Sequence, residues 1–250
     1  MVVYERQKAM RLHKYMAECG VASRRAAEKM IKEGRVRVND QVVTQLGLKI
    51  NPDKDSVAVD NIEIRKPAAH TYIAFNKPPK VITTMKEQFG RGSVADYFKG
   101  LNKRVYPVGR LDYATEGLLL LTDDGELANR LMHPKYHVDK TYTARIRGVF
   151  GKDEEEALEK GIMLDGRKTG PADIKVLDVN GSLYIVRITI SEGRNRQIRR
   201  MFESVGCKVE YLRRDSIGSI KLGELRPGKW RHLSPSEVEY LKKNAGLTED

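Results

Sequence analysis

The amino-acid sequence predicts an α+β fold that consists of a small N-terminal unit and a larger domain. Two amphipathic helical patterns and a few short alternating stretches fill the first 65 residues. Beyond them, helices and strands follow in mixed order, without the regular strand–helix–strand repeat of a doubly wound sheet. We place the domains at residues 1–67 and 68–250, because the basic, proline-containing stretch around residue 67 is typical of a linker.

The N-terminal unit is predicted to contain two short helices followed by a small sheet. The first helix has apolar residues at steps of three and four and ends at Gly20. Ser23 is a typical N-cap for the second helix, and Gly34 is a typical C-terminal stop. Alternating residues over 35–38 and a hairpin pattern over 57–64 predict the strands that close the unit.

The larger domain is predicted to combine strands and short helices. Strands are expected over residues 71–76, 118–121, 142–147, 183–190, 209–212 and 219–222. Helices are expected over residues 94–98, 126–132, 153–160 and 196–205, and after Ser234. The apolar stretch 118–121 is the length of a buried strand and is much too short to span a membrane.

The charge of the chain indicates a polyanionic partner. It carries 46 Lys and Arg against 34 Asp and Glu, a formal net charge of +12, and its pI is about 9.6. No run of about 18 apolar residues is present, and the first 16 residues lack the apolar core of a signal peptide. We therefore expect a cytoplasmic protein that does not bind a membrane.

Neither the cysteines nor the histidines predict a metal or disulfide site. Cys19 and Cys207 are far apart and form no CxxC motif, so we expect no disulfide framework. His133 and His137 have a spacing that could bind a metal on a helix, but Pro134 between them is expected to break that helix.

The second predicted helix is strongly basic. Arg24 and Arg25 lie in its first turn, where cations oppose the helix dipole by about 0.3–1 kcal/mol. That placement suits a phosphate partner better than it suits folding alone, although a solvated charged face would have the same composition. The order and spacing of residues 11–15, 23–28 and 34–39 resemble the S4 RNA-binding domain. The resemblance implies that this unit grips the RNA backbone with basic side chains, namely Arg11, Arg24, Arg25, Lys29, Arg35 and Arg37.

Residues 109–123 place one carboxylate, Asp112, in a glycine-bounded loop directly before the apolar strand. Loop residues held by a rigid strand are common sites of chemistry, but Asp is also common in turns. Spacing alone favours the turn. The whole stretch, however, resembles the signature of the pseudouridine synthases that modify ribosomal RNA, in the branch that carries an N-terminal S4 domain.

The resemblance extends over nearly the whole chain. It continues through residues 140–142, 192–201 and 217–218, and on to Leu233. Residues 195–197 look most like the large-subunit group, type B, whereas the small-subunit group tends to have Tyr-His-Gln there. Lys80 departs from the family, which often has Gly at that position.

This resemblance implies the roles of several residues. Asp112 is the expected catalytic carboxylate, Arg194 the guanidinium that keeps it ionised, and Tyr142 the active-site tyrosine. Arg110 and Leu212 are expected in the substrate pocket. Three further arginines are expected to contact phosphates, namely Arg196, Arg199 and Arg200.

The reaction that the resemblance implies only rearranges atoms, so we expect neither a cofactor nor a metal. The expected function is the isomerisation of a specific uridine to pseudouridine in 23S ribosomal RNA of the large subunit. The alternatives are the same reaction on 16S ribosomal RNA, a non-catalytic RNA-binding ribosome-assembly factor, and an N-glycosidase that releases uracil. The expected partner is ribosomal RNA, free or in an assembling subunit, and the expected state is a monomer.

Overall fold

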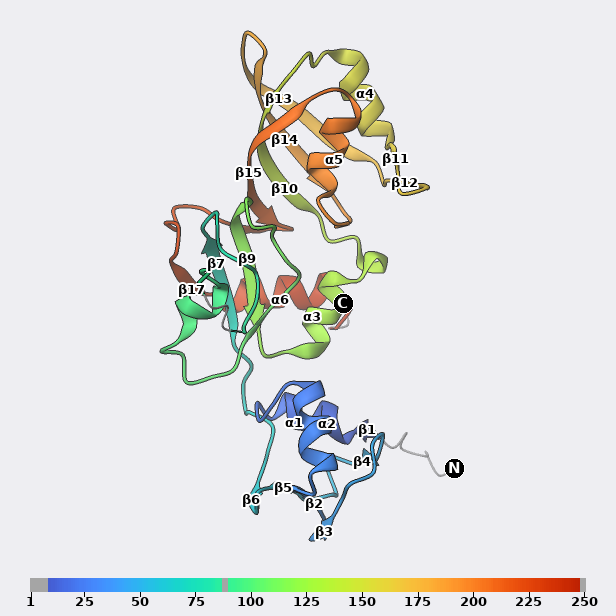
Figure 1. Cartoon of the computed structure of the whole chain (residues 1–250), viewed down its shortest axis with the longest axis vertical. Helices are drawn as coiled ribbons and strands as arrows, with labels where there is room; N and C mark the ends of the chain where they lie inside the picture. Colours follow the sequence, from blue (N-terminus) through green and yellow to red (C-terminus); the bar gives the residue numbers. More distant parts are fainter. Residues whose placement is uncertain (1–8, 87–89, 248–250) are drawn as a thin grey trace. The chain divides into compact units, whose positions relative to one another are not determined.

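The computed structural model describes residues 9–86 and 90–247 of the chain. The chain separates into two compact units that divide between His70 and Thr71, where the sequence predicted a boundary after residue 67 (Figure 1). Residues 1–8, part of the stretch in which no signal-peptide pattern was found, lie outside the described residues. No helix in the described ranges is long and apolar enough to cross a membrane.

The N-terminal unit has the predicted helices and small sheet. The helices are α1 (Leu12–Glu18) and α2 (Arg24–Lys32), and Ser23 caps α2 by accepting a 3.2 Å hydrogen bond from the Ala26 amide. The sheet has the strand order β3 (Gln41–Val42), β2 (Val36–Val38), β5 (Val57–Val59), β6 (Ile62–Glu63). A separate pair joins β1 (Met10–Arg11) and β4 (Lys49–Ile50).

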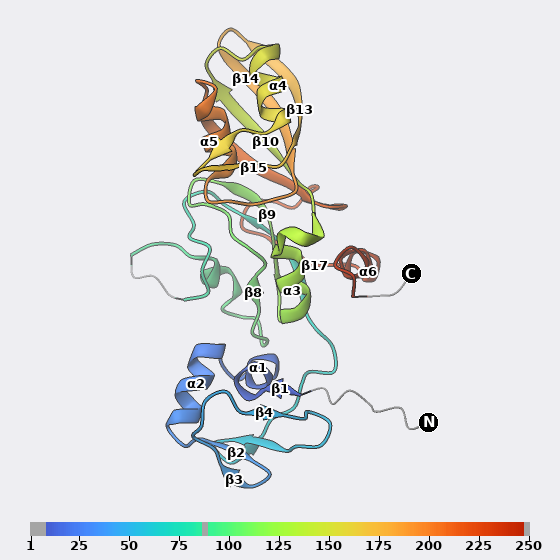
Figure 2. The same ribbon diagram turned by 90° about the vertical axis from the view of Figure 1, so that its right-hand side faces the viewer.

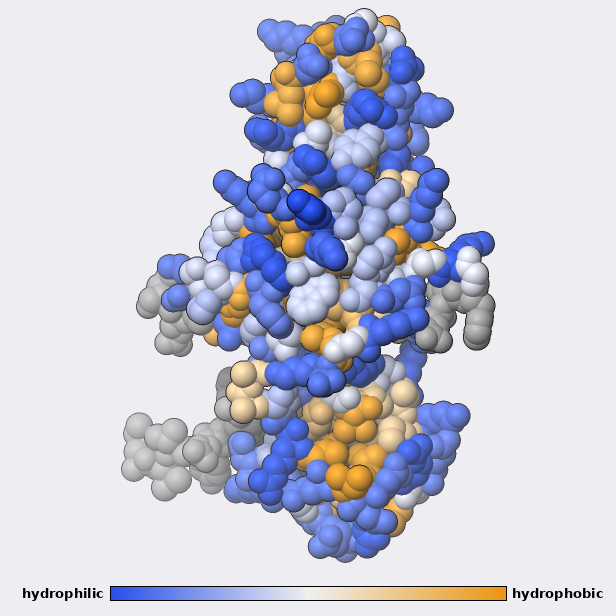
Figure 3. Space-filling model, turned by 90° about the vertical axis from the view of Figure 1, so that its left-hand side faces the viewer, coloured by the Kyte–Doolittle hydropathy of each residue, from blue (hydrophilic) through white to orange (hydrophobic). Residues whose placement is uncertain are grey.

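The core of this unit lies between the helices and one face of the sheet. Leu12 and Met16 of α1 pack with Ala27 and Ile31 of α2 and with the buried valines of β2 and β5. Apolar side chains also reach the surface, among them Val42 and Ile62. Figure 3 accordingly shows an apolar area on this unit within a mainly hydrophilic face.

The larger unit is built on one mixed, mainly antiparallel sheet, as the sequence predicted. Its strand order is β13 (Ala172–Asn180), β14 (Leu183–Ile190), β10 (Lys140–Arg147), β15 (Lys208–Ile217), β9 (Glu116–Thr122), β7 (Tyr72–Lys77), β17 (Trp230–His232). Two short strands extend it, β8 (Tyr106–Pro107) on β9 and β16 (Ile220–Lys221) on β15. Among the described strands, only β15 and β9 run parallel.

Helices cover this sheet differently along its width (Figures 1 and 2). The helices α4 (Lys152–Lys160) and α5 (Gln197–Ser204) pack on Ile146, Val186 and Ile188 of the β10–β14 half. The helices α3 (Gly125–Met132) and α6 (Pro235–Asn244) pack on β9 through Leu118 and Leu120. The alternate leucines of β9 belong to the other core, so this strand is buried on both faces and has a continuous apolar run.

The remaining elements are short. They are the 3-10 helices η1 (Val94–Phe98) and η2 (Pro134–Tyr136) and the hairpin strands β11 (Met163–Leu164) and β12 (Arg167–Lys168). The sequence predicted the helical turn at 94–98 but missed β13 and β17. Both are edge strands. β17 has only three residues, and the apolar alternation of β13 at Ala172, Ile174 and Val176 is interrupted by a register shift between Val176 and Asp178, beside which Leu177 and Val179 are exposed. Lys80 has φ +61°, a left-handed conformation that favours the glycine expected there.

Candidate active site

A cavity of about 750 Å³ opens in the larger unit. Its walls come from the loop before β9, from β10 and β15, and from the 191–197 loop with the start of α5. Every residue that the sequence placed in the catalytic centre or the pocket lines it, namely Arg110, Asp112, Tyr142, Arg194 and Leu212. The structure therefore brings together side chains that are up to 102 positions apart in the chain, from Arg110 to Leu212.

Asp112 is held by a well-ordered turn. The Thr83 hydroxyl donates to the Leu111 carbonyl at 2.7 Å and accepts from the Leu111 amide at 3.2 Å. The Thr115 amide donates to the Asp112 carbonyl at 3.0 Å, which closes the turn into β9. These bonds fix a half-buried carboxylate at the cavity wall.

Gly117 brings this turn close to β15. A Cβ atom at this position would lie 2.3 Å from the Arg214 carbonyl oxygen, and the backbone has φ +105°. Only glycine accepts both conditions without strain. The close parallel pairing of β9 with β15 therefore places the Asp112 turn beside the side chains of β15 that line the cavity.

Tyr142 and Arg214 form a buried pair across β10 and β15. Their Cα atoms are register partners, and the two residues are 7% and 4% exposed. The Arg214 guanidinium lies 5.9 Å from the centroid of the Tyr142 ring, and Nη1 donates to the Tyr142 hydroxyl at 3.4 Å. Leu212, from the same strand, adds an apolar side chain to the wall. The tyrosine ring is thus fixed in a wall where a planar base could pack.

Arg199 is the guanidinium that the structure associates with Asp112, which corrects the prediction of Arg199 as a surface phosphate contact. It is 8% exposed and lines the cavity, and its Nη2 lies 3.5 Å from the Ala114 carbonyl in the Asp112 turn. Burial lowers the pKa of Arg199, and the nearby Asp112 opposes this shift. The sequence missed this role because two adjacent arginines on a helix do not show which one faces inward.

Arg194 does not take the predicted part as the hydrogen-bonded partner of Asp112. Its Nε donates to Glu192 at 3.2 Å, and its other nitrogens donate to the carbonyls of Leu164, Arg167 and Lys168. The guanidinium therefore joins the 191–197 loop to the β11–β12 hairpin and shapes the cavity rim.

The other arginines predicted for this unit differ in exposure. Arg110 and Arg196 are exposed at the cavity wall, and Arg196 is in the left-handed region with φ +49° just before α5. Arg200 points elsewhere, because Asp165 accepts two hydrogen bonds from it at 2.6 and 2.8 Å. Arg200 is therefore less available to phosphate than the sequence suggested.

Two lysines that the sequence did not single out, the half-buried Lys140 and the buried Lys77, lie at or near the cavity. Lys140 lines it and donates to the carbonyls of Val138 at 2.7 Å and Ser191 at 3.5 Å. Burial, and after it Arg214, lowers the pKa of Lys140 to about 8. Lys77 is fully buried and donates to two carbonyls at 2.8 Å, and burial lowers its pKa to about 8 against the effect of Asp112.

The cavity also gathers unsatisfied polar atoms. Within the described ranges, the buried side-chain nitrogen and oxygen atoms without a hydrogen-bond partner are Thr115 Oγ1, Arg199 Nε and Arg214 Nη2. All three residues line the cavity. Because buried polar groups are normally hydrogen-bonded, such a cluster indicates a place where a polar ligand completes the bonding.

The N-terminal unit presents the basic residues that the sequence predicted for RNA. Arg11, Arg24, Arg25 and Lys29 are exposed. Arg35 is exposed as well, but Asp60 accepts two hydrogen bonds from it at 2.6 and 2.9 Å. Arg37 is half-buried and donates to the Asp40 carbonyl. Arg24 and Arg25, at the start of α2, form no ion pair among the described residues, whereas Lys29 of the same helix pairs with Glu33 at 3.7 Å.

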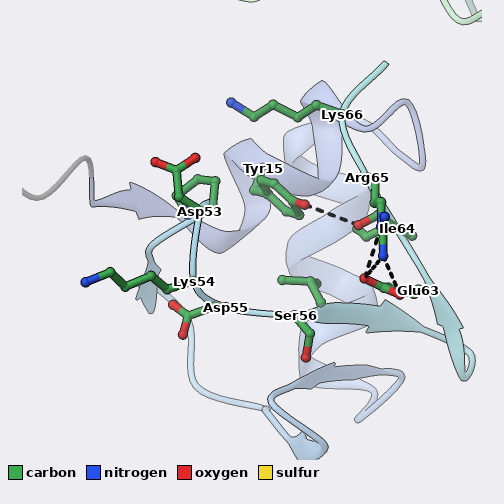
Figure 4. A pocket seen from close by; sticks show the side chains of 11 residues that line it. Tyr15, Asp53, Lys54, Asp55, Ser56, Glu63, Ile64, Arg65 and Lys66 are labelled. Carbon is green, nitrogen blue, oxygen red and sulfur yellow. Dashed lines mark hydrogen bonds and ion pairs between the residues drawn. The ribbon is translucent and has the colours of Figure 1, made fainter. Parts of the chain in front are cut away.

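A second hollow, of about 480 Å³, lies in the N-terminal unit (Figure 4). The Tyr15 hydroxyl at its wall donates to the Ile64 carbonyl at 3.2 Å. Acidic and basic side chains alternate around it, namely Asp53, Lys54, Asp55, Glu63, Arg65 and Lys66. This mixture of charges does not select a polyanion, so the hollow is not the basic surface that the sequence predicted.

Comparison with known proteins agrees with both units. The family model of RNA pseudouridylate synthase matches residues 71–204, and the model of the S4 domain matches residues 10–55. A solved structure described as pseudouridylate synthase superposes with a TM-score of 0.67 at 33% identity, over 93% of this chain and 99% of that one.

Two relatives can be aligned with this chain over almost the full length of both proteins. The ribosomal large subunit pseudouridine synthase B of Bacillus subtilis (strain 168) is 47% identical over 93% of this chain and 95% of that protein. An uncharacterized RNA pseudouridine synthase of Aquifex aeolicus (strain VF5) is 44% identical over 95% of this chain and 96% of that protein. The chain therefore belongs to the RNA pseudouridylate synthase family and is an enzyme of that kind, with an N-terminal S4 domain.

Proposed function

We propose that this enzyme converts a specific uridine of 23S ribosomal RNA into pseudouridine in the cytoplasm, with Asp112 as the reacting carboxylate and without a cofactor. The observation that carries the proposal is the position of Asp112, on a fixed turn in a cavity beside the buried Arg199. The name of the Bacillus subtilis relative, a large-subunit enzyme, supports the choice of RNA. The likeness of residues 195–197 to the large-subunit group supports it as well.

The reaction needs one ionised carboxylate. The N1–C1′ bond breaks, the base turns over, and C5 bonds to C1′ while C5 loses a proton and N1 gains one. Asp112 acts either as a nucleophile on the sugar or base, or as the base that removes the 2′ proton. In either route Arg199 places a positive charge beside the turn that carries the carboxylate. Tyr142 supplies a ring on which the uracil stacks.

The target uridine must leave its stack to reach Asp112. Unstacking costs a few kcal/mol and is cheapest in loops and single strands, so we propose a loop uridine as the target. The exposed cations of α2 anchor the RNA backbone through the S4 domain, and Arg110 and Arg196 do so at the cavity.

The decisive experiment compares wild-type enzyme with Asp112→Asn. Pseudouridine is mapped in 23S and 16S ribosomal RNA from cells that lack the gene and express either form. We expect one 23S site to depend on the wild-type enzyme and to stay unmodified with Asp112→Asn, while the purified variant binds the RNA with unchanged affinity. Asp173→Asn, which changes an exposed aspartate on β13, is the matched control and should restore modification.

The same experiment separates the alternatives. A dependent site in 16S would move the substrate to the small subunit. Modification that persists with Asp112→Asn would exclude Asp112 as the reacting group. An RNA-binding assembly factor would leave the modification map unchanged when the gene is lost. An N-glycosidase would produce an abasic site and a loss of mass, whereas isomerisation leaves the mass of the RNA unchanged.

A further inference from the structure

The Arg214 guanidinium has one side fixed by the protein and one side free. Its Nε donates to the Leu118 carbonyl at 2.6 Å, and Nη1 donates to the Tyr142 hydroxyl at 3.4 Å. Its Nη2 is buried without a partner, although the residue lines the cavity. An arginine side chain that is 4% exposed is thus held rigidly with one donor left for a ligand.

The surroundings of Arg214 are rich in positive charge. In the described part of the chain, Arg214 donates to the Leu118 carbonyl and the Tyr142 hydroxyl, and no carboxylate forms a hydrogen bond or ion pair with it. The half-buried Lys140 also lines the cavity, its ammonium group donates to backbone carbonyls, and the charge of Arg214 helps to lower its pKa. A buried cation without an anionic partner is unfavourable, so an electronegative ligand that accepts a hydrogen bond from Arg214 gains strongly from that contact.

Arg199 and Arg214 serve different sides of the cavity. Arg199 comes from α5 and touches the Asp112 turn at the Ala114 carbonyl. Arg214 comes from β15 and touches the Tyr142 ring, against which a base would pack. A buried guanidinium therefore lies beside the turn of the reacting carboxylate, and another lies beside the ring on which the uracil would pack.

The proposed function makes a specific demand on the base side. When the N1–C1′ bond breaks, the bonding electrons stay on the uracil as an anion whose charge is shared by N1, O2 and O4. We propose that Arg214 Nη2 donates a hydrogen bond to a carbonyl oxygen of the uracil and stabilises this anion, so that Arg214 is a catalytic residue. This inference rests on the proposed function. The donor is fixed before the charge appears, which is how preorganised groups lower a barrier.

The test combines an enzyme variant with an altered base. A short RNA is assembled with uridine, 2-thiouridine or 4-thiouridine at the mapped target position only, because sulfur accepts hydrogen bonds more weakly than oxygen. Rates of base isomerisation are measured in single turnover at saturating RNA. With wild-type enzyme, we expect one of the two sulfur substitutions to slow the reaction about tenfold.

With Arg214→Met, we expect the rate on normal RNA to fall about 100-fold, while the Kd for RNA changes less than threefold. In this variant, the sulfur substitution that slows the wild-type enzyme should slow the reaction less than twofold relative to normal RNA, because the Arg214 donor that bonds to this atom of the base has been removed. Arg214→Lys keeps the charge but not the fork of donors, so the penalty should be lost there too. Arg213→Met is the matched control. Arg213 is the residue next to Arg214, but its side chain is half-exposed and bound to Asp215. This variant should show the same sulfur penalty as the wild-type enzyme.

Two results would overturn the inference. One is a sulfur penalty of the same size in wild-type enzyme, Arg214→Met and Arg214→Lys, and the other is the absence of any penalty in wild-type enzyme. If the wild-type enzyme is active and Asp112→Asn is inactive on the same RNA, either result leaves the proposed function intact. If the wild-type enzyme forms no pseudouridine in any ribosomal RNA, the proposed function and the inference fail together. Circular dichroism of each variant identifies loss of folding.

Discussion

The arginines at the start of α2 and the two buried arginines of the cavity are the same residue in opposite surroundings. Arg24 and Arg25 are exposed at the start of a helix, whereas Arg199 and Arg214 are 8% and 4% exposed. An exposed guanidinium contributes a screened, long-range attraction for phosphate. A buried one acts over a short distance in a low dielectric, where its orientation matters most. The comparison separates exposed from buried guanidinium groups, and we expect the exposed ones to bind RNA and the buried ones to serve the chemistry.

The largest effect that separates the two groups is expected at Arg199. In Arg199→Met, we expect the single-turnover rate to fall about 1,000-fold at saturating RNA, because Asp112 loses the positive charge beside it. The affinity for RNA should change less than threefold. The measurement is pseudouridine formation in a target transcript, with RNA binding measured separately by fluorescence anisotropy.

Arg200→Met is the matched control for Arg199→Met. It removes the adjacent arginine of α5, whose guanidinium is already bound to Asp165. We expect its rate to stay within threefold of wild type. If Arg199→Met and Arg200→Met lose rate equally, the burial of Arg199 does not give it a different role from its neighbour on α5.

The sequence could predict the fold of this enzyme more fully than its site. Helices with strong patterns, such as α2 with its Ser23 cap, follow from local rules, and so does the buried strand β9. The small predicted strand over 209–212 belongs to a longer strand, β15, that runs from Lys208 to Ile217. Its second half carries Arg213, Arg214 and Asp215, and charged residues there hide a strand that is paired on both sides.

The roles of the arginines could not be predicted, because they depend on tertiary contacts. Arg194 and Arg199 lie five positions apart and have the same side chain. The 191–197 loop turns Arg194 toward Glu192 and the β11–β12 hairpin, while α5 turns Arg199 toward the Ala114 carbonyl. The resemblance to the family led us to assign the guanidinium beside Asp112 to Arg194, and the order of residues along the chain gave no sign that Arg199 is the arginine that faces the Asp112 turn.

A smaller effect, on binding alone, is expected on α2. In the double variant Arg24→Glu with Arg25→Glu, we expect the affinity for the target RNA at 0.15 M salt to fall about tenfold, because two phosphate contacts are replaced by repulsion. The slope of log K against log salt should flatten by about 1.4 to 1.8, from about 0.7 to 0.9 for each phosphate. The rate at saturating RNA should stay within twofold. An unchanged salt slope would show that this helix does not contact phosphate.

The titration of Lys140 tests whether positive charge near Arg214 contributes to the chemical step. The pKa of Lys140 is lowered to about 8, so its ammonium is charged below that pH and neutral above it. If that charge helps to stabilise the leaving base, the single-turnover rate should fall about fivefold between pH 7.5 and pH 9. In Lys140→Arg the side chain stays protonated, so the fall should disappear.

Lys77 provides the competing explanation, because its pKa is also lowered to about 8. A fall in rate that persists in Lys140→Arg would assign the titration to Lys77, whose pKa Asp112 also influences, and would contradict the role of Lys140.

The smallest effect is expected at Arg35, an exposed arginine that is already paired with carboxylates of the same unit. The guanidinium of Arg35 is held by Asp60, with two hydrogen bonds, and approaches Glu33 at 3.6 Å. Phosphate must compete with these carboxylates, so Arg35 releases fewer counterions from RNA than an unpaired arginine does. We expect Arg35→Gln to change the affinity for RNA less than twofold and the salt slope by less than about 0.3, while Arg24→Gln changes the slope by about 0.7 to 0.9. Parallel salt titrations of the two variants measure this difference. Equal changes would show that Arg35 leaves Asp60 when RNA binds, and that exposure alone, rather than pairing, decides which cations of the S4 domain contact RNA.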